Sequence, residues 1–214
     1  MKFRSQTLSI LLLSLPLTLA AGTVPAKTKT VYDYSLVGLD GKEVSLATYK
    51  GKVLLIVNLA SQSIYKSQLT GLKELQKTYS DKGLVLIGIP SGDFGAQELS
   101  DGAAIQKYYQ DTEQVNFPVF SKSSLRGKDA IPLAHFLTDP KDGTSGGEIH
   151  WNYTKFLVDR QGKPVLRYEV DSDPSDPELR VQLEQVLDGT YKMKESPVKE
   201  GDTSAADDDD DGGL

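Results

Sequence analysis

The sequence predicts an α/β fold in which a mixed central β-sheet is flanked by helices. Two unbroken apolar runs, at residues 53–57 and 84–89, are rich in β-branched side chains and are typical of strands buried on both faces. Between them, leucines at positions 69, 72 and 75 follow the spacing of one helix face. Strand, helix and strand in this order predict two parallel strands joined by a right-handed crossover.

The segment before the first apolar run is expected to form a β-hairpin. Residues 31–36 alternate between apolar and polar side chains, and residues 43–46 resume as a short strand. Asp40 and Gly41 lie between them and suit a tight turn. An N-terminal hairpin therefore precedes the first buried strand, which we place at residues 53–59.

The rest of the chain alternates between helical and extended patterns. The helix after the first buried strand should run to about Lys82, because Gly83 ends it. A β-hairpin with its turn at residues 160–163 and a closing amphipathic helix ended by Gly189 complete the fold. In chain order we predict helix 101–115, an extended segment at 117–120, helix 132–137, strands 151–159 and 165–168, and helix 177–187.

Composition narrows the possible functions. The chain has 214 residues, so one medium domain with extensions is expected. It contains no cysteine, which excludes disulfides, thiolate metal sites and thiol redox chemistry. The formal net charge is −6, and an aspartate run at 207–211 supplies most of it. The rest of the chain is nearly neutral and has no basic stripe for nucleic acid. The aspartate run is expected to be a solvated tail rather than a calcium site.

Both ends of the chain differ in composition from its middle. Lys2 and Arg4 precede an apolar stretch at 8–19, which is the pattern of a cleaved secretory signal. The stretch is shorter than the roughly 20 residues that span a bilayer, so we expect a secreted or periplasmic protein without stable membrane insertion, rather than a retained anchor. The predicted divisions are residues 1–26 as signal peptide and short linker, 27–189 as the folded domain, and 190–214 as a disordered acidic tail.

Polar segments follow both buried strands. A turn at residues 61–63 follows the first strand, and a glycine-rich loop at 90–97 follows the second. Because parallel strands end at the same edge of a sheet, these segments should lie close together. The N-terminus of the helix after the turn favours an anion there. We therefore expect the functional site at this edge, with Ser63 in its turn.

Four stretches of the chain carry recognisable motifs. They are Lys52–Ser61, Gly88–Pro90 with Phe94–Glu98, Phe117–Lys122, and the Trp-Asn-Tyr-Thr-Lys-Phe-Leu-Val-Asp string of Trp151–Asp159. In this order and spacing they resemble the glutathione peroxidase family over about residues 31–188. The resemblance implies a thioredoxin-like fold. It also implies a site built from a peroxidatic cysteine or selenocysteine, a glutamine, a tryptophan and an asparagine.

The same resemblance assigns the site residues. Gln97, Trp151 and Asn152 match the family's glutamine, tryptophan and asparagine, which would place hydrogen-bond donors around the nucleophile. Ser63 occupies the nucleophile position, and Ile64 stands where the family has glycine. This chain therefore departs from the family pattern at the residue that carries the reaction.

Serine at position 63 changes the expected chemistry. Peroxide reduction needs a nucleophile that ionises near neutral pH and is oxidised to a sulfenic acid, which thiols then recycle. A serine hydroxyl does neither, so we predict that thiol peroxidase activity is lost and that the remnant pocket binds a hydroperoxide or a small polar ligand. The alternative is an active peroxidase in the response to oxidative stress, if Ser63 stands in for a native cysteine or selenocysteine.

Other interpretations of these residues stay open. Ser63 could be an inert helix cap, Gln97 a solvated loop residue, and Trp151 a core side chain. His150 could serve Ser63 as a general base, but no Gly-x-Ser-x-Gly elbow surrounds this serine. We expect no cofactor and no metal. A monomer is expected because residues 132–151 lack the insertion found in tetrameric members.

Overall fold

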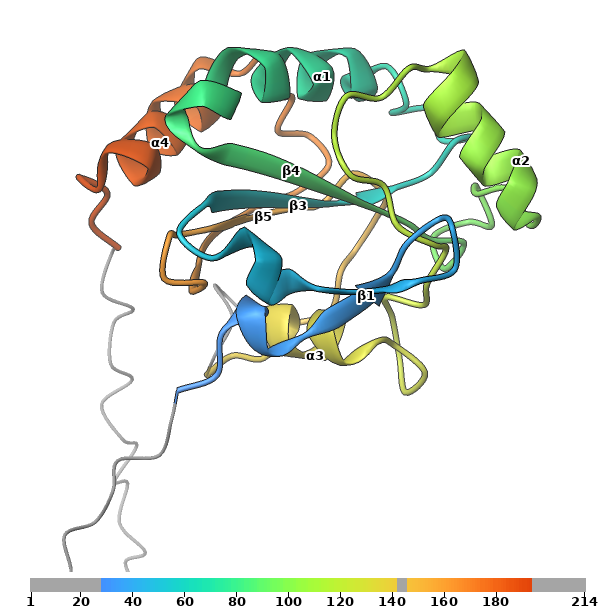
Figure 1. Ribbon diagram of the computed structural model, residues 1–214, viewed down its shortest axis with the longest axis horizontal. Coiled ribbons are helices and arrows are strands. Elements are labelled where there is room, and N and C mark those ends of the chain that lie inside the picture. Colours follow the sequence, from blue (N-terminus) through green and yellow to red (C-terminus); the bar gives the residue numbers. More distant parts are fainter. Residues whose placement is uncertain (1–27, 142–145, 194–214) are drawn as a thin grey trace, which may run out of the picture.

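A computed structural model describes residues 28–141 and 146–193 (Figure 1). The predicted signal peptide and most of the predicted acidic tail lie outside the described residues. The strands are β1 (Ser35–Val37), β2 (Glu43–Ser45), β3 (Val53–Leu59), β4 (Leu84–Pro90), β5 (Lys155–Val158) and β6 (Pro164–Tyr168). The α-helices are α1 (Gln68–Tyr79), α2 (Gly102–Gln106), α3 (Pro132–Thr138) and α4 (Pro177–Asp188).

The central sheet has four strands in the order β4-β3-β5-β6. Strands β3 and β4 run parallel, with Val53 opposite Leu84, whereas β3–β5 and β5–β6 are antiparallel. Strands β1 and β2 form a separate antiparallel hairpin. The mixed sheet and the N-terminal hairpin confirm the predicted fold class.

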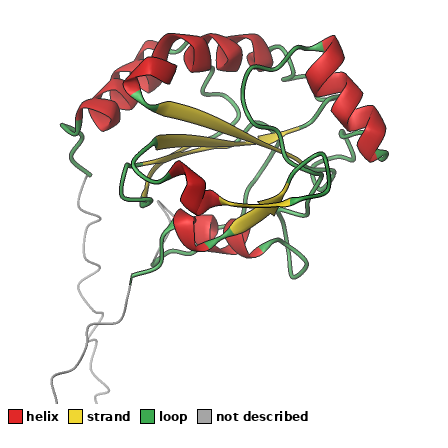
Figure 2. Ribbon diagram, in the orientation of Figure 1, coloured by secondary structure: helices red, strands yellow, loops and turns green. Residues whose placement is uncertain are grey.

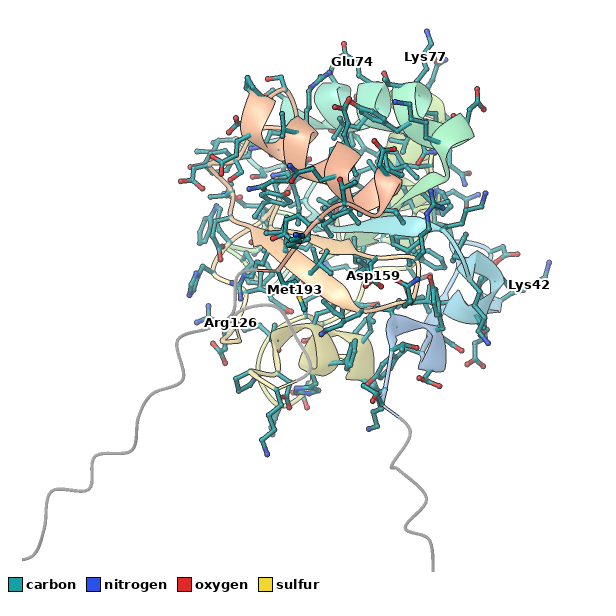
Figure 3. All side chains as sticks on the ribbon, turned by 90° about the vertical axis from the view of Figure 1, so that its left-hand side faces the viewer. Lys42, Glu74, Lys77, Arg126, Asp159 and Met193 are labelled. Atoms are coloured by element: carbon teal, nitrogen blue, oxygen red, sulfur yellow. The ribbon has the colours of Figure 1, made fainter. Side chains whose placement is uncertain are left out.

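Helices cover both faces of the central sheet (Figure 2). Odd-numbered residues of β3 pack with α1 and α4, while Leu54 and Ile56 pack with α3 and the N-terminal segment. Every side chain of β3 is buried, which is why its sequence is a continuous apolar run. The polar side of α1 faces outward, as Glu74 and Lys77 show in Figure 3.

Local sequence signals fix the ends of several helices. The Asp176 side chain accepts a hydrogen bond from the Glu178 backbone N–H at 3.0 Å and caps α4, which begins with Pro177. Gly189 ends α4 with a left-handed φ of 73°. Gly83 does the same after the short 3₁₀ turn that follows α1, with a φ of 96°. Both glycine stops confirm the sequence prediction.

Two predicted elements differ from the structure in the first half of the chain. Residues 31–33 form a 3₁₀ turn rather than a strand, because the Asp33 carboxylate accepts hydrogen bonds from the Thr30 backbone N–H and hydroxyl at 3.0 and 3.1 Å. The predicted helix at 101–115 is instead α2 followed by a π-helical segment at Lys107–Thr112. Across the described ranges, no helix is long and apolar enough to cross a membrane.

Candidate active site

Three segments meet at the edge of the sheet where β3 and β4 end and β5 begins, on the side of α2 in Figure 1. The Gln62 backbone N–H donates to the Gln97 carbonyl at 2.9 Å, which joins the first turn to the loop after β4. The Tyr153 N–H donates to the Asn58 carbonyl at 2.8 Å, which joins the segment before β5 to the end of β3. The structure thus brings Ser63, Gln97 and Trp151 to one edge of the sheet.

Ser63 lies in the turn between β3 and α1 and is only 1% exposed. Its hydroxyl oxygen accepts a hydrogen bond from the Tyr65 backbone N–H at 3.2 Å, and its own N–H donates to the Ala60 carbonyl at 3.2 Å. Helix α1 begins at Gln68 with Ser67 at the N-cap. The interpretation of Ser63 as the cap of this helix is therefore wrong, because its hydroxyl stabilises the turn that precedes the helix.

Asn152 is fully buried, and its amide group holds the glycine-rich loop. Its Nδ2 donates to Gln97 Oε1 at 2.9 Å and to the Phe94 carbonyl at 3.1 Å. Both amide hydrogens are thus engaged, and Asn152 Oδ1 has no hydrogen-bond partner within the described part of the chain. Asn152 therefore orients Gln97, whose own amide nitrogen is left as a donor.

Trp151 lies at the surface, with 37% of its area exposed. Its indole packs over Gly95, where an added Cβ would lie 3.4 Å from Trp151 Cη2 and 3.5 Å from Gln97 Cγ. The Trp151 carbonyl accepts hydrogen bonds from Asn58 Nδ2 and Thr154 Oγ1, both at 3.0 Å. Trp151 is thus beside Gln97, as a pocket position requires, and not a buried core residue.

The strand predicted to begin at Trp151 begins only at Lys155. The prediction is therefore wrong for residues 151–154, which form a turn before β5. Tyr153 adopts a left-handed φ of 62°, which is uncommon for a bulky side chain. The Tyr153 ring is fully buried in the core, and its hydroxyl donates to the Ala60 carbonyl at 3.4 Å. Core packing of this ring therefore compensates for the strained backbone, and the chain turns before it becomes a strand.

A buried carboxylate that we did not single out from the sequence ties the first turn to the loop after β4. Glu98 is 5% exposed, and its two oxygens accept hydrogen bonds from the Ser61 N–H and hydroxyl, the Leu99 N–H, and the Tyr109 hydroxyl. Burial, together with this nearby carboxylate, raises the pKa of Tyr109 far above its usual value. Glu98 directly follows Gln97 in the matched stretch, which could have drawn attention to this residue, although not to its partners.

The two histidines do not form a base for Ser63. His150 is a largely exposed side chain whose Nδ1 lies 3.6 Å from Glu169 Oε1, and His135 is exposed on α3. Among the residues that the structure describes, no group of three or more acidic or histidine side chains is placed to hold a metal ion. In the observed contacts, Ser63 therefore has no histidine partner of the kind that a hydrolytic triad requires.

The architecture of this chain, with the candidate site at the edge where β3 and β4 end, is a thioredoxin-like fold. A thioredoxin-family thiol:disulfide interchange protein from Chlorobium tepidum has the same fold, with 21% identity, a TM-score of 0.55, and 77% of this chain and 99% of that chain covered. The crystal structure of Trgpx in apo form is more similar in sequence, with 30% identity and a TM-score of 0.60 over 76% of this chain and 97% of that chain.

The sequence places the chain in a particular family within this fold. A family model described as "Glutathione peroxidase" matches residues 31–138. A glutathione peroxidase from Lactococcus lactis subsp. cremoris is 38% identical over 71% of this chain and 96% of its own length. A hydroperoxy fatty acid reductase from Synechocystis sp. is 41% identical over 74% of this chain and 96% of its own length. The chain belongs to the glutathione peroxidase family, as the resemblance predicted.

Proposed function

We propose that this chain is a glutathione peroxidase family member that has lost thiol peroxidase turnover. It binds a hydroperoxide or small polar ligand at the edge of the sheet where β3 and β4 end. The observation that carries the proposal is the absence of cysteine from all 214 residues. The motif resemblance supports it by assigning Ser63 to the position of the family's nucleophile. Thiol peroxidases transfer the terminal peroxide oxygen to a thiolate, which becomes a sulfenic acid while an alcohol or water leaves. A serine oxygen has no such oxidation step.

The arrangement of donors supports a binding role. Within the described part of the chain, Gln97 Nε2 and Trp151 Nε1 make no hydrogen bond to protein, whereas Asn152 Nδ2 donates to both Gln97 Oε1 and the Phe94 carbonyl. A side-chain amide that Asn152 orients, beside a partly exposed indole, suits a ligand with an oxygen acceptor and a short apolar part. A hydroperoxide is one such ligand.

The main test is a peroxidase assay of the unmodified protein. Purified protein is expected to consume no hydrogen peroxide above the buffer rate with either glutathione or thioredoxin as reductant. Turnover above that rate would refute the proposed loss of activity.

A Ser63→Cys variant then tests whether the surrounding site is intact. Because the donors of Gln97 and Trp151 are retained, we expect the new thiol to form a sulfenic acid with hydrogen peroxide faster than an ordinary thiol does. Ser67→Cys is a matched control, since Ser67 is an exposed residue of the same connection. If the two thiols react at the same rate, the proposed site has decayed together with its nucleophile.

An active peroxidase is the second candidate, and membership of the family favours it. It requires that position 63 be cysteine or selenocysteine in the native protein. The codon for position 63 in genomic DNA decides between the two candidates. A serine codon supports loss of the reaction, and a cysteine or selenocysteine codon supports a peroxidase.

We also propose that residues 1–26 direct export and that the mature protein is a monomer. The basic and apolar pattern of the first residues supports export, and the short connection between residues 132 and 151 supports a monomer. N-terminal sequencing of the exported protein tests the first proposal, and light scattering of the purified protein tests the second. An uncleaved N-terminus or a tetrameric mass would contradict them.

A further inference from the structure

Asn58 is a polar residue on an apolar face of the sheet. Along β3, Leu54 and Ile56 face the α3 layer, and alternation places Asn58 on the same face. Asn58 is 3% exposed and lines a small cavity beneath α3. The other residues that line this cavity are all aliphatic or aromatic, among them Ile89 and Phe156. Asn58 therefore supplies the polar side chain of an otherwise apolar cavity.

The oxygen of this amide is left without a partner. Across the described ranges, Asn58 Oδ1 is buried and accepts no hydrogen bond. A buried carbonyl oxygen without a donor lowers stability, whereas an apolar group of the same shape would not. Leucine has nearly the shape of asparagine and suits the lining of this cavity. Stability alone therefore does not explain why asparagine stands here.

The nitrogen of the amide, in contrast, has a defined partner. The β3–β5 ladder ends where Val57 faces Lys155, so Asn58 lies just beyond it, opposite the turn that precedes β5. Its backbone N–H donates to the Thr154 carbonyl at 3.3 Å. Its side-chain Nδ2 donates to the Trp151 carbonyl at 3.0 Å. The side chain thus reaches past the ladder to the residue whose indole packs over the glycine-rich loop.

We propose that Asn58 is a positioning residue: it fixes the main chain of Trp151 so that the indole is held beside Gln97. Asparagine is retained here for this purpose at a cost in stability. This rests on the proposed function only in that Trp151 belongs to the ligand site. Thr154 Oγ1 donates to the same Trp151 carbonyl at 3.0 Å. Two side-chain donors, one from β3 and one from the turn before β5, therefore determine where this carbonyl, and with it the indole, lies.

The experiment uses Trp151 as its own reporter, because it is the only tryptophan in the chain. Acrylamide quenching of its fluorescence is measured in the full-length wild-type protein and in Asn58→Leu, together with the urea midpoint of unfolding. We expect Asn58→Leu to raise the quenching constant at least twofold while the urea midpoint stays unchanged or rises. Ile56→Val is the matched control, since Ile56 lines the same cavity from the same strand but does not contact Trp151 in the observed bonds. It should leave the quenching constant unchanged.

Asn58→Ala keeps the proposal testable if leucine does not fold at this position, because it removes the amide without adding volume. It should raise the quenching constant as Asn58→Leu does. Quenching that is unchanged in Asn58→Ala, or raised equally by Ile56→Val, would assign Asn58 a purely structural role and overturn the proposal. The readout needs no ligand, so a failure to bind hydroperoxide would overturn the proposed function without deciding this result.

Discussion

Lys155, the first residue of β5, is fully buried. Its contribution to the free energy of unfolding depends on pH. Its ammonium donates hydrogen bonds to the carbonyl oxygens of Tyr153 and Ser172, each at 2.8 Å. Burial lowers the pKa of Lys155 to about 8 because it disfavours the charged form, and nearby carboxylates, Asp173 foremost, offset only part of this effect. The folded chain therefore holds this proton less tightly than the unfolded chain, whose lysine pKa is 10.5.

This difference fixes the sign of the pH dependence. Between the folded and unfolded pKa values of Lys155, the unfolded state binds more protons, so the free energy of unfolding rises with pH. One pKa unit corresponds to about 1.4 kcal/mol. For a folded pKa of about 8, the Lys155 contribution rises by about 2 kcal/mol between about pH 7 and about pH 9.5. Tyr109 and Tyr153, whose pKa values burial raises, act in the opposite direction only as pH passes the unfolded tyrosine value near 10.

The variant Lys155→Met tests this prediction. Urea unfolding at about pH 7 and about pH 9.5 gives the free energy of unfolding of the variant and the wild type. The difference, variant minus wild type, is expected to fall by about 2 kcal/mol across that interval, because only the wild type gains stability from deprotonation. Lys163→Met is the control, since Lys163 is exposed, and its difference from wild type should not change. A Lys155→Met difference that is the same at both pH values would refute the reasoning.

Two further predictions concern a buried hydrogen-bond acceptor and a close-packed glycine near the site. Glu98→Gln should lower the free energy of unfolding by about 2 kcal/mol, because an amide NH₂ replaces an oxygen that accepts hydrogen bonds from Ser61 or Tyr109. An unchanged urea midpoint would show that the carboxylate charge is not needed there. Gly88→Ala should cost about 1–3 kcal/mol, since its Cβ would lie 2.5 Å from Leu59 Cδ1 in the core. Gly102→Ala, whose Cβ would meet no atom within 4 Å, is the control in the same denaturation assay, and equal losses in the two variants would contradict the packing argument.

Elements with a local signal were predictable from the sequence. The first buried strand was placed at 53–59, and β3 has these bounds, because a strand covered on both faces needs apolar residues without interruption. Gly83 and Gly189 were recognised as helix stops for an equally local reason, since a left-handed residue is most easily a glycine. These signals lie within a few residues of the feature that they predict.

The parts that sequence reasoning missed depend on distant contacts. Residues 151–154 look like the start of a strand, but Tyr153 is held in a left-handed conformation by the core around its ring. Asn58 and Glu98 gave no sign of their partners, because those partners, Trp151 and Ser61, lie far along the chain. Their roles follow from tertiary structure and not from periodicity.

The order of the strands attaches the segments around the candidate site to the sheet in two different ways. The turn after β3 and the turn before β5 are attached to the two inner strands of the sheet, each paired on both sides. The loop that carries Gln97 follows β4, whose outer edge makes backbone hydrogen bonds to residues 118–123 rather than to a further strand. If the site adapts to ligands of different size, the adjustment falls on the Gln97 loop, while Trp151 keeps its place. Hydrogen exchange should accordingly be faster in residues 91–98 than in residues 151–154.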